Sequence, residues 1–347
     1  MKEDLYISEF DPKSTMVTKR TKIERPKFPV IDGHNHLEIV GDYWMTHPVS
    51  ELLDMMDQAN VEAIVDLDGG WGREIYDRHW ERFKEAAPDR FIMYAGVPWE
   101  KYQEMGNEFP DYACERLRKQ VQGGAQGLKI DKRFGLEFKD PTGDLVKVDD
   151  PVLAPIWETA ADLNIPVTIH VADPVAFFQP LDKNNERWEL LHLHPEWHFP
   201  SPPYPSFLSI IERLENLVKR HHRTTFIGAH VGCYSENLEW VGNMLDKYPN
   251  FNVDICERLD YLGRQPYAAR KFFLKYPDRI LFGIDVVPSL DWYRLYARFL
   301  ETDDEYFHYY NIDPPRDVRW FIYGIYLPDD VLKKVYSENA KRLLNLD

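Results

Sequence analysis

Short apolar runs recur eight times along the chain, and each is followed by an amphipathic stretch with helical periodicity. The apolar runs predict strands at Val30–Leu37, Val61–Leu67, Phe91–Pro98, Ala125–Ile130, Pro166–Val171, Thr225–Val231, Phe251–Cys256 and Ile280–Val286. The amphipathic stretches predict helices at Glu51–Gln58, Arg73–Ala87, Tyr112–Val121, Leu153–Leu163, Phe207–His221, Asn237–Tyr248, Tyr267–Tyr276 and Trp292–Leu300. Strict alternation of strand and helix requires a parallel sheet covered by helices. Eight such units predict an α/β protein with the (β/α)₈ TIM barrel architecture.

An open, doubly wound sheet is the structural alternative. Such sheets commonly bind dinucleotides through a glycine-rich turn after the first strand. No pattern of that kind follows Val30–Leu37, and Gly69-Gly70 after the second run lacks the required spacing. The barrel is therefore the favoured prediction.

Three segments lie outside the repeating units. Residues 1–28 mix both signs of charge without periodicity and predict an N-terminal arm that lies on the body or on a partner subunit. Residues 172–205, after the fifth strand, are too long for an ordinary connection and predict an aromatic lid. Residues 301–327 form a second aromatic insertion, which includes Tyr306–Tyr310. We expect residues 29–346 to form a single barrel domain that closes with a helix in Pro328–Leu346.

The net charge of the chain limits the kinds of molecule that we expect it to bind. The formal net charge is −16, from 58 acidic and 42 basic residues, so nucleic acids and anionic membrane surfaces would be repelled. A small-molecule substrate is the expected partner. The aromatic insertions also suggest a pocket completed by a second copy of the chain, that is, a homodimer.

Cysteine usage and hydropathy indicate the compartment. Cys114, Cys233 and Cys256 are too few and too scattered for a disulfide framework, which suggests reducing surroundings. No apolar run approaches the roughly 20 residues needed to span a bilayer. The polar N-terminus does not match a signal peptide. We expect a cytoplasmic protein.

Two histidines close the first predicted strand. His34 and His36 are one residue apart, and alternation along a strand points both side chains to the same face. Imidazole is a common ligand of divalent transition metals. The pair therefore needs only partners from other strands to form a metal site.

Further polar residues stand at the ends of later strands. His170 ends the fifth strand, His230 ends the sixth and Asp285 ends the eighth. Active sites of (β/α)₈ barrels form at the carboxyl ends of the strands. We therefore expect these three side chains to meet His34 and His36 at one edge.

This ordered set resembles the amidohydrolase superfamily. The resemblance rests on Asp32-Gly33-His34-Asn35-His36, His170, Gly228-Ala229-His230, Phe282-Gly283-Ile284-Asp285 and Asn339-Ala340-Lys341-Arg342-Leu343, and it covers about residues 29–346. It points to the amidohydrolase-related (amidohydrolase 2) branch of metal-dependent hydrolases, which also contains aminocarboxymuconate and resorcylate decarboxylases.

The resemblance implies a role for each residue. His34, His36, His170 and Asp285 would hold one divalent ion, Asp285 would take a proton from water, and His230 would polarise the substrate. Three imidazoles and a carboxylate suit Zn²⁺ first, with Mn²⁺ or Fe²⁺ as alternatives, and they do not suit Ca²⁺.

Lys129 ends the fourth strand. In binuclear members of the superfamily a carbamylated lysine at this strand bridges two metals, but the branch resembled here is usually mononuclear. We therefore expect Lys129 to pair with a carboxylate such as Asp66 or Asp68.

Several residues are candidates for substrate binding. A guanidinium near the site would bind a substrate carboxylate through two hydrogen bonds. The candidates are Arg258 and Arg264 after the seventh strand, Arg73 after the second, Trp99 after the third and Asp173 after His170. The histidines of the lid, His192, His194 and His198, have spacings broken by proline and are not expected to bind a second metal.

The resulting first hypothesis is a metal-dependent hydrolase that cleaves a C–O or C–N bond of a small, carboxylated or cyclic substrate such as a lactone. The alternatives on the same barrel are a non-oxidative decarboxylase of an aromatic or enol acid and a sugar-lactone isomerase. A metal-binding barrel without catalytic activity is the non-enzymatic alternative, and the complete polar set argues against it.

Overall fold

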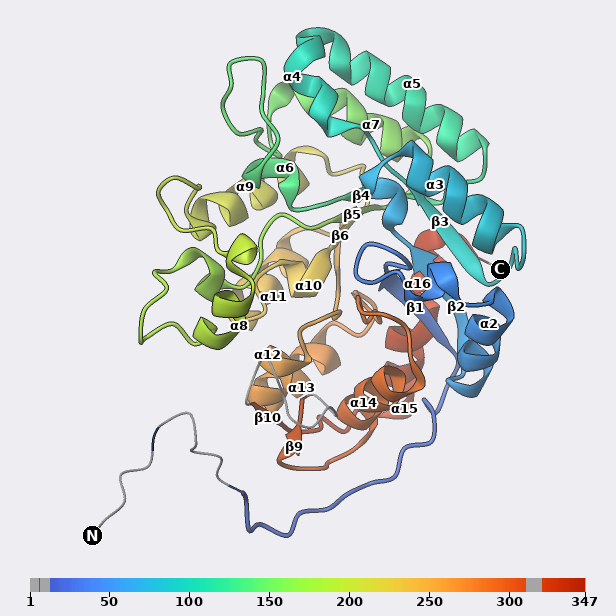
Figure 1. Cartoon of the computed structure of the whole chain (residues 1–347), viewed down its shortest axis with the longest axis vertical. Helices are drawn as coiled ribbons and strands as arrows, with labels where there is room; N and C mark the ends of the chain where they lie inside the picture. The colour runs from blue at the N-terminus through green and yellow to red at the C-terminus, as the bar shows by residue number, and fades with distance from the viewer. Residues whose placement is uncertain (1–5, 7–12, 310–319, 347) are drawn as a thin grey trace.

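The computed structural model describes residues 6, 13–309 and 320–346. Eight parallel strands form one sheet in which each strand pairs with the next in chain order. They are β1 (Val30–Asn35), β2 (Val61–Asp66), β3 (Phe91–Ala95), β4 (Gly127–Ile130), β5 (Val167–Ile169), β6 (Phe226–Gly228), β7 (Phe251–Asp254) and β8 (Ile280–Leu281). Every one falls inside its predicted apolar run. Helices surround the strands (Figure 1), so the predicted (β/α)₈ barrel is confirmed.

The barrel closes where the last strand meets the first. The amide of Gly33 donates to the carbonyl oxygen of Phe282 at 2.9 Å, and the amide of Asp285 donates to the carbonyl oxygen of His34 at 3.0 Å. The two backbones approach so closely that a Cβ atom on Gly283 would lie 2.8 Å from Cβ of His34. Glycine at position 283 therefore permits the seam that joins β1 to the chain after β8.

The predicted helices are present with small shifts of their ends. The longer ones are α2 (Val49–Gln58), α3 (Arg73–His79), α5 (Phe109–Gln122), α7 (Ala154–Asp162), α9 (Phe207–Arg220), α11 (Leu238–Lys247), α13 (Pro266–Lys275) and α14 (Leu290–Glu301). The short ones are α1 (Tyr43–Thr46), α4 (Tyr102–Met105), α6 (Arg133–Leu136), α8 (Trp188–Leu193), α10 (Ala229–Gly232), α12 (Leu259–Arg264), α15 (Asp329–Lys333) and α16 (Asn339–Leu344). A π-helical turn at Trp80–Lys84 extends α3, and another at Lys334–Glu338 joins α15 to α16.

The insertion at residues 172–205 packs onto the barrel through its aromatic residues. Phe177, Phe178 and Phe199 are buried there. Arg187 of this insertion is also buried and bonds to the carboxylate of Asp260 and, at 3.1 Å, to the hydroxyl of Tyr261, both on α12. These contacts tie the insertion to the segment that follows β7.

The second insertion contains a two-stranded antiparallel sheet of β9 (Phe307–His308) and β10 (Phe321–Ile322). Tyr310, which the sequence places in its aromatic run, lies outside the described residues. Trp320 covers the guanidinium groups of Arg187 and Arg264 at 4.2 and 3.8 Å from its ring centre. The two insertions therefore meet above α12.

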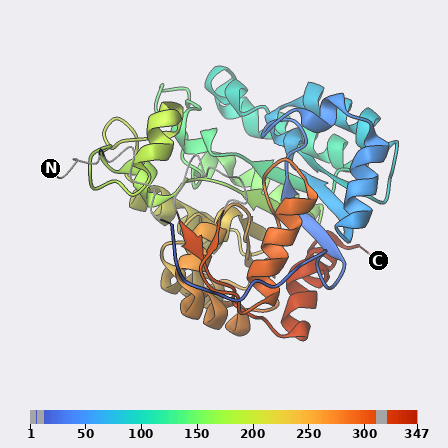
Figure 2. The same ribbon diagram turned by 60° about the horizontal axis from the view of Figure 1, so that its bottom comes forward.

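The described part of the N-terminal arm runs across the outside of the barrel (Figure 2). The amide and hydroxyl of Thr21 donate to the carboxylate of Asp304 at 2.7 and 2.6 Å. Lys27 pairs with Asp329 at 2.6 Å, and the guanidinium of Arg294 donates to the carbonyl oxygen of Glu24 at 2.9 Å. No helix within residues 13–309 and 320–346 is both long and apolar enough to cross a membrane.

Candidate metal centre

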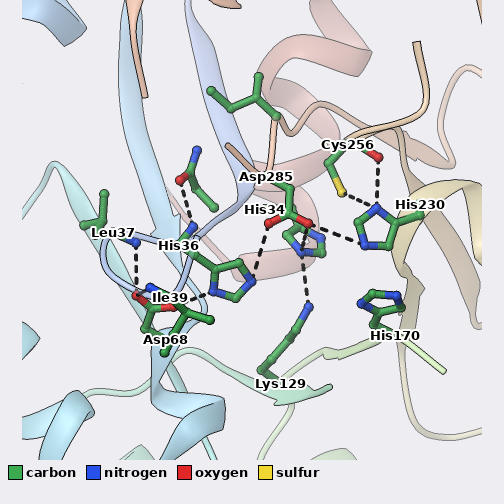
Figure 3. A network of polar contacts seen from close by, with 12 residues as sticks. His34, His36, Leu37, Ile39, Asp68, Lys129, His170, His230, Cys256 and Asp285 are labelled. Atoms are coloured by element: carbon green, nitrogen blue, oxygen red, sulfur yellow. Dashed lines mark hydrogen bonds and ion pairs between the residues drawn. The ribbon is translucent and has the colours of Figure 1, made fainter. Parts of the chain in front are cut away.

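The five polar residues that the sequence placed at strand ends meet at the carboxyl end of the barrel (Figure 3). His34 lies in β1 and His36 directly follows it, while His170 directly follows β5. His230 lies just beyond β6, and Asp285 lies beyond β8. Parallel strands present their carboxyl ends at the same edge, and this arrangement brings together residues that are far apart in the sequence.

The carboxylate of Asp285 lies at the centre of this group. Its Oδ2 atom is 3.6 Å from Nε2 of His34 and 3.5 Å from Nε2 of His230. Its Oδ1 atom is 3.6 Å from Nε2 of His36. Three imidazoles therefore direct the same ring nitrogen toward one carboxylate.

Buried carboxylates fix the orientation of the first two rings. Nδ1 of His34 lies 2.8 Å from Oδ2 of Asp254, and Nδ1 of His36 lies 2.5 Å from Oδ1 of Asp68. Burial alone raises the pKa of Asp68, but the charge of His36 and its hydrogen bond hold that pKa below its ordinary value. Asp68 is thus an anion that accepts the Nδ1 proton of His36, which leaves Nε2 free to bind a metal.

His230 is oriented by the backbone. Its Nδ1 atom lies 3.0 Å from the carbonyl oxygen of Cys256, which can only accept, so Nδ1 carries the proton. Burial, and then the nearby charge of Arg258, hold the pKa of His230 well below its usual range. The ring is therefore neutral, and its bare Nε2 faces Asp285.

His170 stands beside His230, with 4.3 Å between the ring centres. Burial lowers the pKa of His170 to about 4, so this ring is also neutral at physiological pH. Its Nε2 atom is 3.5 Å from Oδ1 of Asp173, whose other oxygen pairs with Lys132 at 2.5 Å.

The backbone is unusual at the two residues that the sequence predicts to act in catalysis. His230 and Asp285 have φ angles of 57° and 53°, in the left-handed region that residues other than glycine seldom adopt. Hydrogen bonds hold both conformations, because the amide of His230 donates to Asp254 at 2.8 Å and that of Asp285 donates to His34. Such strain concentrates at functional sites.

The donor set fits a divalent ion. Nε2 of His170 and Oδ1 of Asp285, two of the expected ligand atoms, are buried, and neither has a hydrogen-bond partner in the described part of the chain. Buried polar atoms are rarely left in this state unless a ligand, an ion or water satisfies them. Imidazole nitrogens with a carboxylate oxygen are ligands that zinc, manganese and iron accept.

Cys256 is a residue that the sequence did not indicate. Ligand atoms of His34, His230, Cys256 and Asp285 all lie within 4.8 Å of one another. Burial, and then the charge of Asp254, raise the pKa of the Cys256 thiol well above its ordinary value. The thiol donates to Oδ1 of Asp254 at 2.9 Å, so it supports that carboxylate and is not poised as a thiolate ligand.

The expectation for Lys129 is wrong. Its amine does not pair with Asp66 or Asp68 but lies 3.1 Å from Nε2 of His34, inside the centre. Both carboxylates have other partners, since Asp68 holds His36 and Asp66 holds His79 at 2.7 Å.

His79 of α3 is fully buried and lies beside the buried carboxylates of Asp66 and Asp68. Its Nδ1 atom bonds to Asp66, and its Nε2 atom lies 2.9 Å from Oε2 of Glu38, which also pairs with Arg78 at the surface. Burial lowers the pKa of His79, but the hydrogen bond to Asp66 and the charges of Asp66 and Asp68 outweigh it and raise that pKa to about 9. His79 is therefore a buried cation that compensates the carboxylates around it.

The five candidates for substrate binding fall into two groups, one at the centre and one away from it. Arg258 is buried, 7% exposed, and its charge acts on His230. Within the described residues its guanidinium makes one hydrogen bond, to the carbonyl oxygen of Glu257 at 2.6 Å. Asp173 lies beside His170. These two belong to the centre.

The other three candidates have partners elsewhere. Arg264 pairs with Glu186 at 3.0 Å, and Arg73 pairs with Asp77 at 2.9 Å on the outside of the barrel. Trp99 is buried in the aromatic core, with its ring 4.4 Å from Phe134. The lid histidines are dispersed: His192 stacks on Trp188, His194 stacks on Trp197, and His198 contacts the carbonyl oxygen of Gln179.

Two further carboxylates were missed from the sequence. Asp254 ends β7 in the same way that the predicted ligands end their strands, so its position was a signal that could have found it. Glu257 has a φ of 50°, and its buried Oε1 atom has no hydrogen-bond partner among the described residues. Burial, and then the charge of Asp285, raise the pKa of Glu257 to about 8.

Comparison with known proteins places the chain in a family. The fold is similar to 2,6-dihydroxybenzoate decarboxylase from Rhizobium, with a TM-score of 0.57 and 19% identity over 92% of this chain and 99% of the other. It is similar to a dihydroxybenzoic acid decarboxylase from Polaromonas with bound manganese and the inhibitor 2-nitroresorcinol, with a TM-score of 0.55 and 15% identity over 92% and 97% of the two chains. It is also similar to 4-oxalomesaconate hydratase from Rhodopseudomonas palustris, with a TM-score of 0.53 and 15% identity over 91% and 96%.

These identities establish a shared fold alone, and no curated protein matches the chain. A family model described as amidohydrolase matches residues 31–346, which is nearly the whole barrel. The motifs that carried the resemblance in the sequence lie within that match. The chain therefore belongs to the amidohydrolase family.

Proposed function

We propose that the protein is a metal-dependent, non-oxidative decarboxylase of a small aromatic or enol acid. The observation that carries this proposal is the likeness of the whole barrel to two decarboxylases of dihydroxybenzoates, one of them with bound manganese. It favours the decarboxylase alternative over the hydrolase that was the first hypothesis from the sequence.

His34, His36, His170 and Asp285 would hold the ion. A divalent ion bound by them would act as a Lewis acid toward oxygen atoms of the substrate. Zinc was the first expectation from the donor types, and the Polaromonas enzyme makes manganese an equal candidate.

Arg258 would bind the substrate carboxylate. Its guanidinium is buried, its charge acts on His230, and it has donors left over after the hydrogen bond to Glu257 that it makes among the described residues. A buried cation with unused donors is a strong site for a carboxylate, because a guanidinium and a carboxylate match in geometry.

Asp285 would carry the proton of the reaction. In its protonated form, Oδ1 would donate to the carbon that bears the carboxylate, the C–C bond would break, its electron pair would return to the ring or enol, and CO₂ would leave. Asp285 would then regain a proton from solvent. The neutral Nε2 of His230, 3.5 Å from Asp285, would accept a hydrogen bond from a hydroxyl group of the substrate and orient it.

Hydrolysis is the second candidate function. The same Asp285 and His230 could deprotonate water and polarise a carbonyl group. The sugar-lactone isomerase and the barrel without catalytic activity have no specific support from the structure.

The deciding experiment offers the metal-loaded protein a panel of hydroxybenzoates, enol acids and lactones in a mixture of D₂O and H₂¹⁸O, with mass detection. A decarboxylase releases CO₂ and leaves one deuterium on carbon. Cleavage of a lactone into a product that gains ¹⁸O, without loss of CO₂, would establish a hydrolase. The Asp285→Asn variant is the control for activity from contaminants.

A further inference from the structure

Asp254 is the last residue of β7, and its carboxylate lies between two histidines of the centre. Its Oδ2 atom accepts a hydrogen bond from Nδ1 of His34 at 2.8 Å, and its Oδ1 atom accepts one from the backbone amide of His230 at 2.8 Å. The side chain of Asp254 is fully buried. One carboxylate at the end of β7 therefore touches a residue of β1 and a residue that follows β6. The first is expected to hold the ion, and the second is expected to orient the substrate.

Cys256 completes a closed ring of hydrogen bonds around His230. Its carbonyl oxygen accepts from Nδ1 of the His230 ring at 3.0 Å, while its thiol and its amide donate to Oδ1 of Asp254 at 2.9 and 3.3 Å. The amide of His230 donates to the same oxygen. Both the ring of His230 and its left-handed backbone, with a φ of 57°, are thus held by residues at the end of β7.

The four groups that the described residues direct at the carboxylate of Asp254 are all donors, namely the ring of His34, the amide of His230 and the amide and thiol of Cys256. An ionised carboxylate only accepts hydrogen bonds, so it satisfies all four at once. Asparagine has nearly the same size, but its NH₂ group would face a donor on whichever side it lay. An aspartate at position 254 can therefore hold both histidines, and an asparagine cannot.

We propose that Asp254 is a positioning residue that fixes His34 and His230 as one unit, with their ring centres 5.2 Å apart. Asp68 provides the contrast, because it orients the ring of His36 and makes no hydrogen bond to His230 among the described residues. Loss of either carboxylate should weaken metal binding, but only loss of Asp254 should also disturb His230. The inference goes beyond the proposed decarboxylation and applies equally to hydrolysis at the same centre.

The test compares Asp254→Asn with Asp68→Asn in the full-length protein at saturating zinc, with ¹⁵N in the histidine rings. NMR reads the ring nitrogens of His230, and their loss in His230→Gln identifies the signals. The wild type should show a proton on Nδ1 and none on Nε2. Asp254→Asn should mix the two tautomers or broaden these signals, whereas Asp68→Asn should leave them unchanged. Competition with a chelator should show zinc binding about 10- to 100-fold weaker in both variants.

Two results would overturn the proposal. One is a folded Asp254→Asn variant in which the signals of His230 or the zinc affinity match those of the wild type. The other is an equal disturbance of His230 in Asp68→Asn, which would indicate a general effect of lost support around the ion.

A double-mutant cycle checks that Asp254 acts on the ion through His34. In the His34→Gln background, Asp254→Asn should cause no further loss of zinc affinity, although it should still disturb the signals of His230. An equal loss of affinity in both backgrounds would contradict the proposal.

A crystal structure of the zinc-loaded wild type decides the question even if Asp254→Asn does not fold. Oδ2 of Asp254 should remain bonded to Nδ1 of His34, and Oδ1 to the amide of His230. The absence of either hydrogen bond would overturn the proposal. None of these measurements uses turnover, so failure of the proposed decarboxylation leaves this inference standing, and failure of the inference leaves the reaction standing.

Discussion

Nδ1 of His36 lies 2.5 Å from Oδ1 of Asp68, and the other oxygen of Asp68 accepts from the backbone amides of Leu37 and Glu38 at 3.0 and 2.8 Å. Asp68 therefore holds both the ring of His36 and the turn that follows β1. One carboxylate therefore fixes both the conformation of this turn and the direction in which Nε2 of His36 points.

Asp68→Asn should weaken metal binding by about 10- to 100-fold, because an amide can donate to Nδ1 and select the wrong tautomer of His36. Competition with a chelator of known affinity measures the change. Asp57→Asn is the matched control, since Asp57 is exposed and pairs with Arg90 at the surface. Equal metal affinity in both variants would remove Asp68 from the support of the centre.

His79→Gln should destabilise the fold by roughly 3–5 kcal/mol, because it leaves buried carboxylates without their cation. The folded pKa of His79, about 9, lies above the unfolded value of 6.5. A raised pKa stabilises the fold fully below about pH 6.5, and this contribution is lost as pH rises through about 9.

Urea unfolding of the wild type and His79→Gln between about pH 6 and pH 9.5 therefore checks both the loss of stability and its dependence on pH. The difference in unfolding free energy should be largest at the acid end and shrink toward the alkaline end. His222→Gln, at an exposed position, is the control. A difference that does not vary with pH contradicts a cationic His79.

His34→Ala and His170→Ala should each lose most of the bound metal, because each removes one imidazole nitrogen of the set. Elemental analysis of the purified wild type should find about one divalent ion per chain. Full occupancy in both variants would refute the ligand assignment, and two ions per chain would point to a bridging role for Lys129.

His230→Ala should reduce turnover by about 100-fold or more while the metal content stays near that of the wild type. The reason is that His230 is expected to orient the substrate and not to hold the ion. Turnover and metal content are measured on the same preparation. Normal turnover would exclude His230 from the mechanism.

Arg258→Gln should weaken the binding of carboxylated substrates by roughly 2–5 kcal/mol, because the substrate charge would then be buried without a partner. The effect should appear in KM. Arg264→Gln is the matched control, since its guanidinium already pairs with Glu186. Similar KM values for the two variants would place the carboxylate elsewhere.

The sequence predicted the barrel and the meeting of five side chains because both depend on local patterns. Apolar runs set the strands, and the carboxyl ends of parallel strands share one edge, so a polar residue at each end must face the same space. His34, His36, His170, His230 and Asp285 meet there, and their individual roles stay predictions.

Which side chain pairs with each buried carboxylate could not be predicted in the same way. Lys129 was expected to pair with Asp66 or Asp68, but His79, from a helix without any motif, occupies Asp66, and His36 occupies Asp68. Such competition is decided by packing in three dimensions. Asp254, in contrast, ends its strand as the predicted site residues do, so the same pattern could have predicted it.

The seam of the barrel has a consequence for how the protein matures. His34 lies on the first strand and Asp285 beyond the last, and their backbones are hydrogen-bonded to each other across the seam. A growing chain on the ribosome therefore lacks the central carboxylate of the site until nearly all of the barrel has been synthesised. Incomplete chains therefore cannot bring all five polar residues of the centre together.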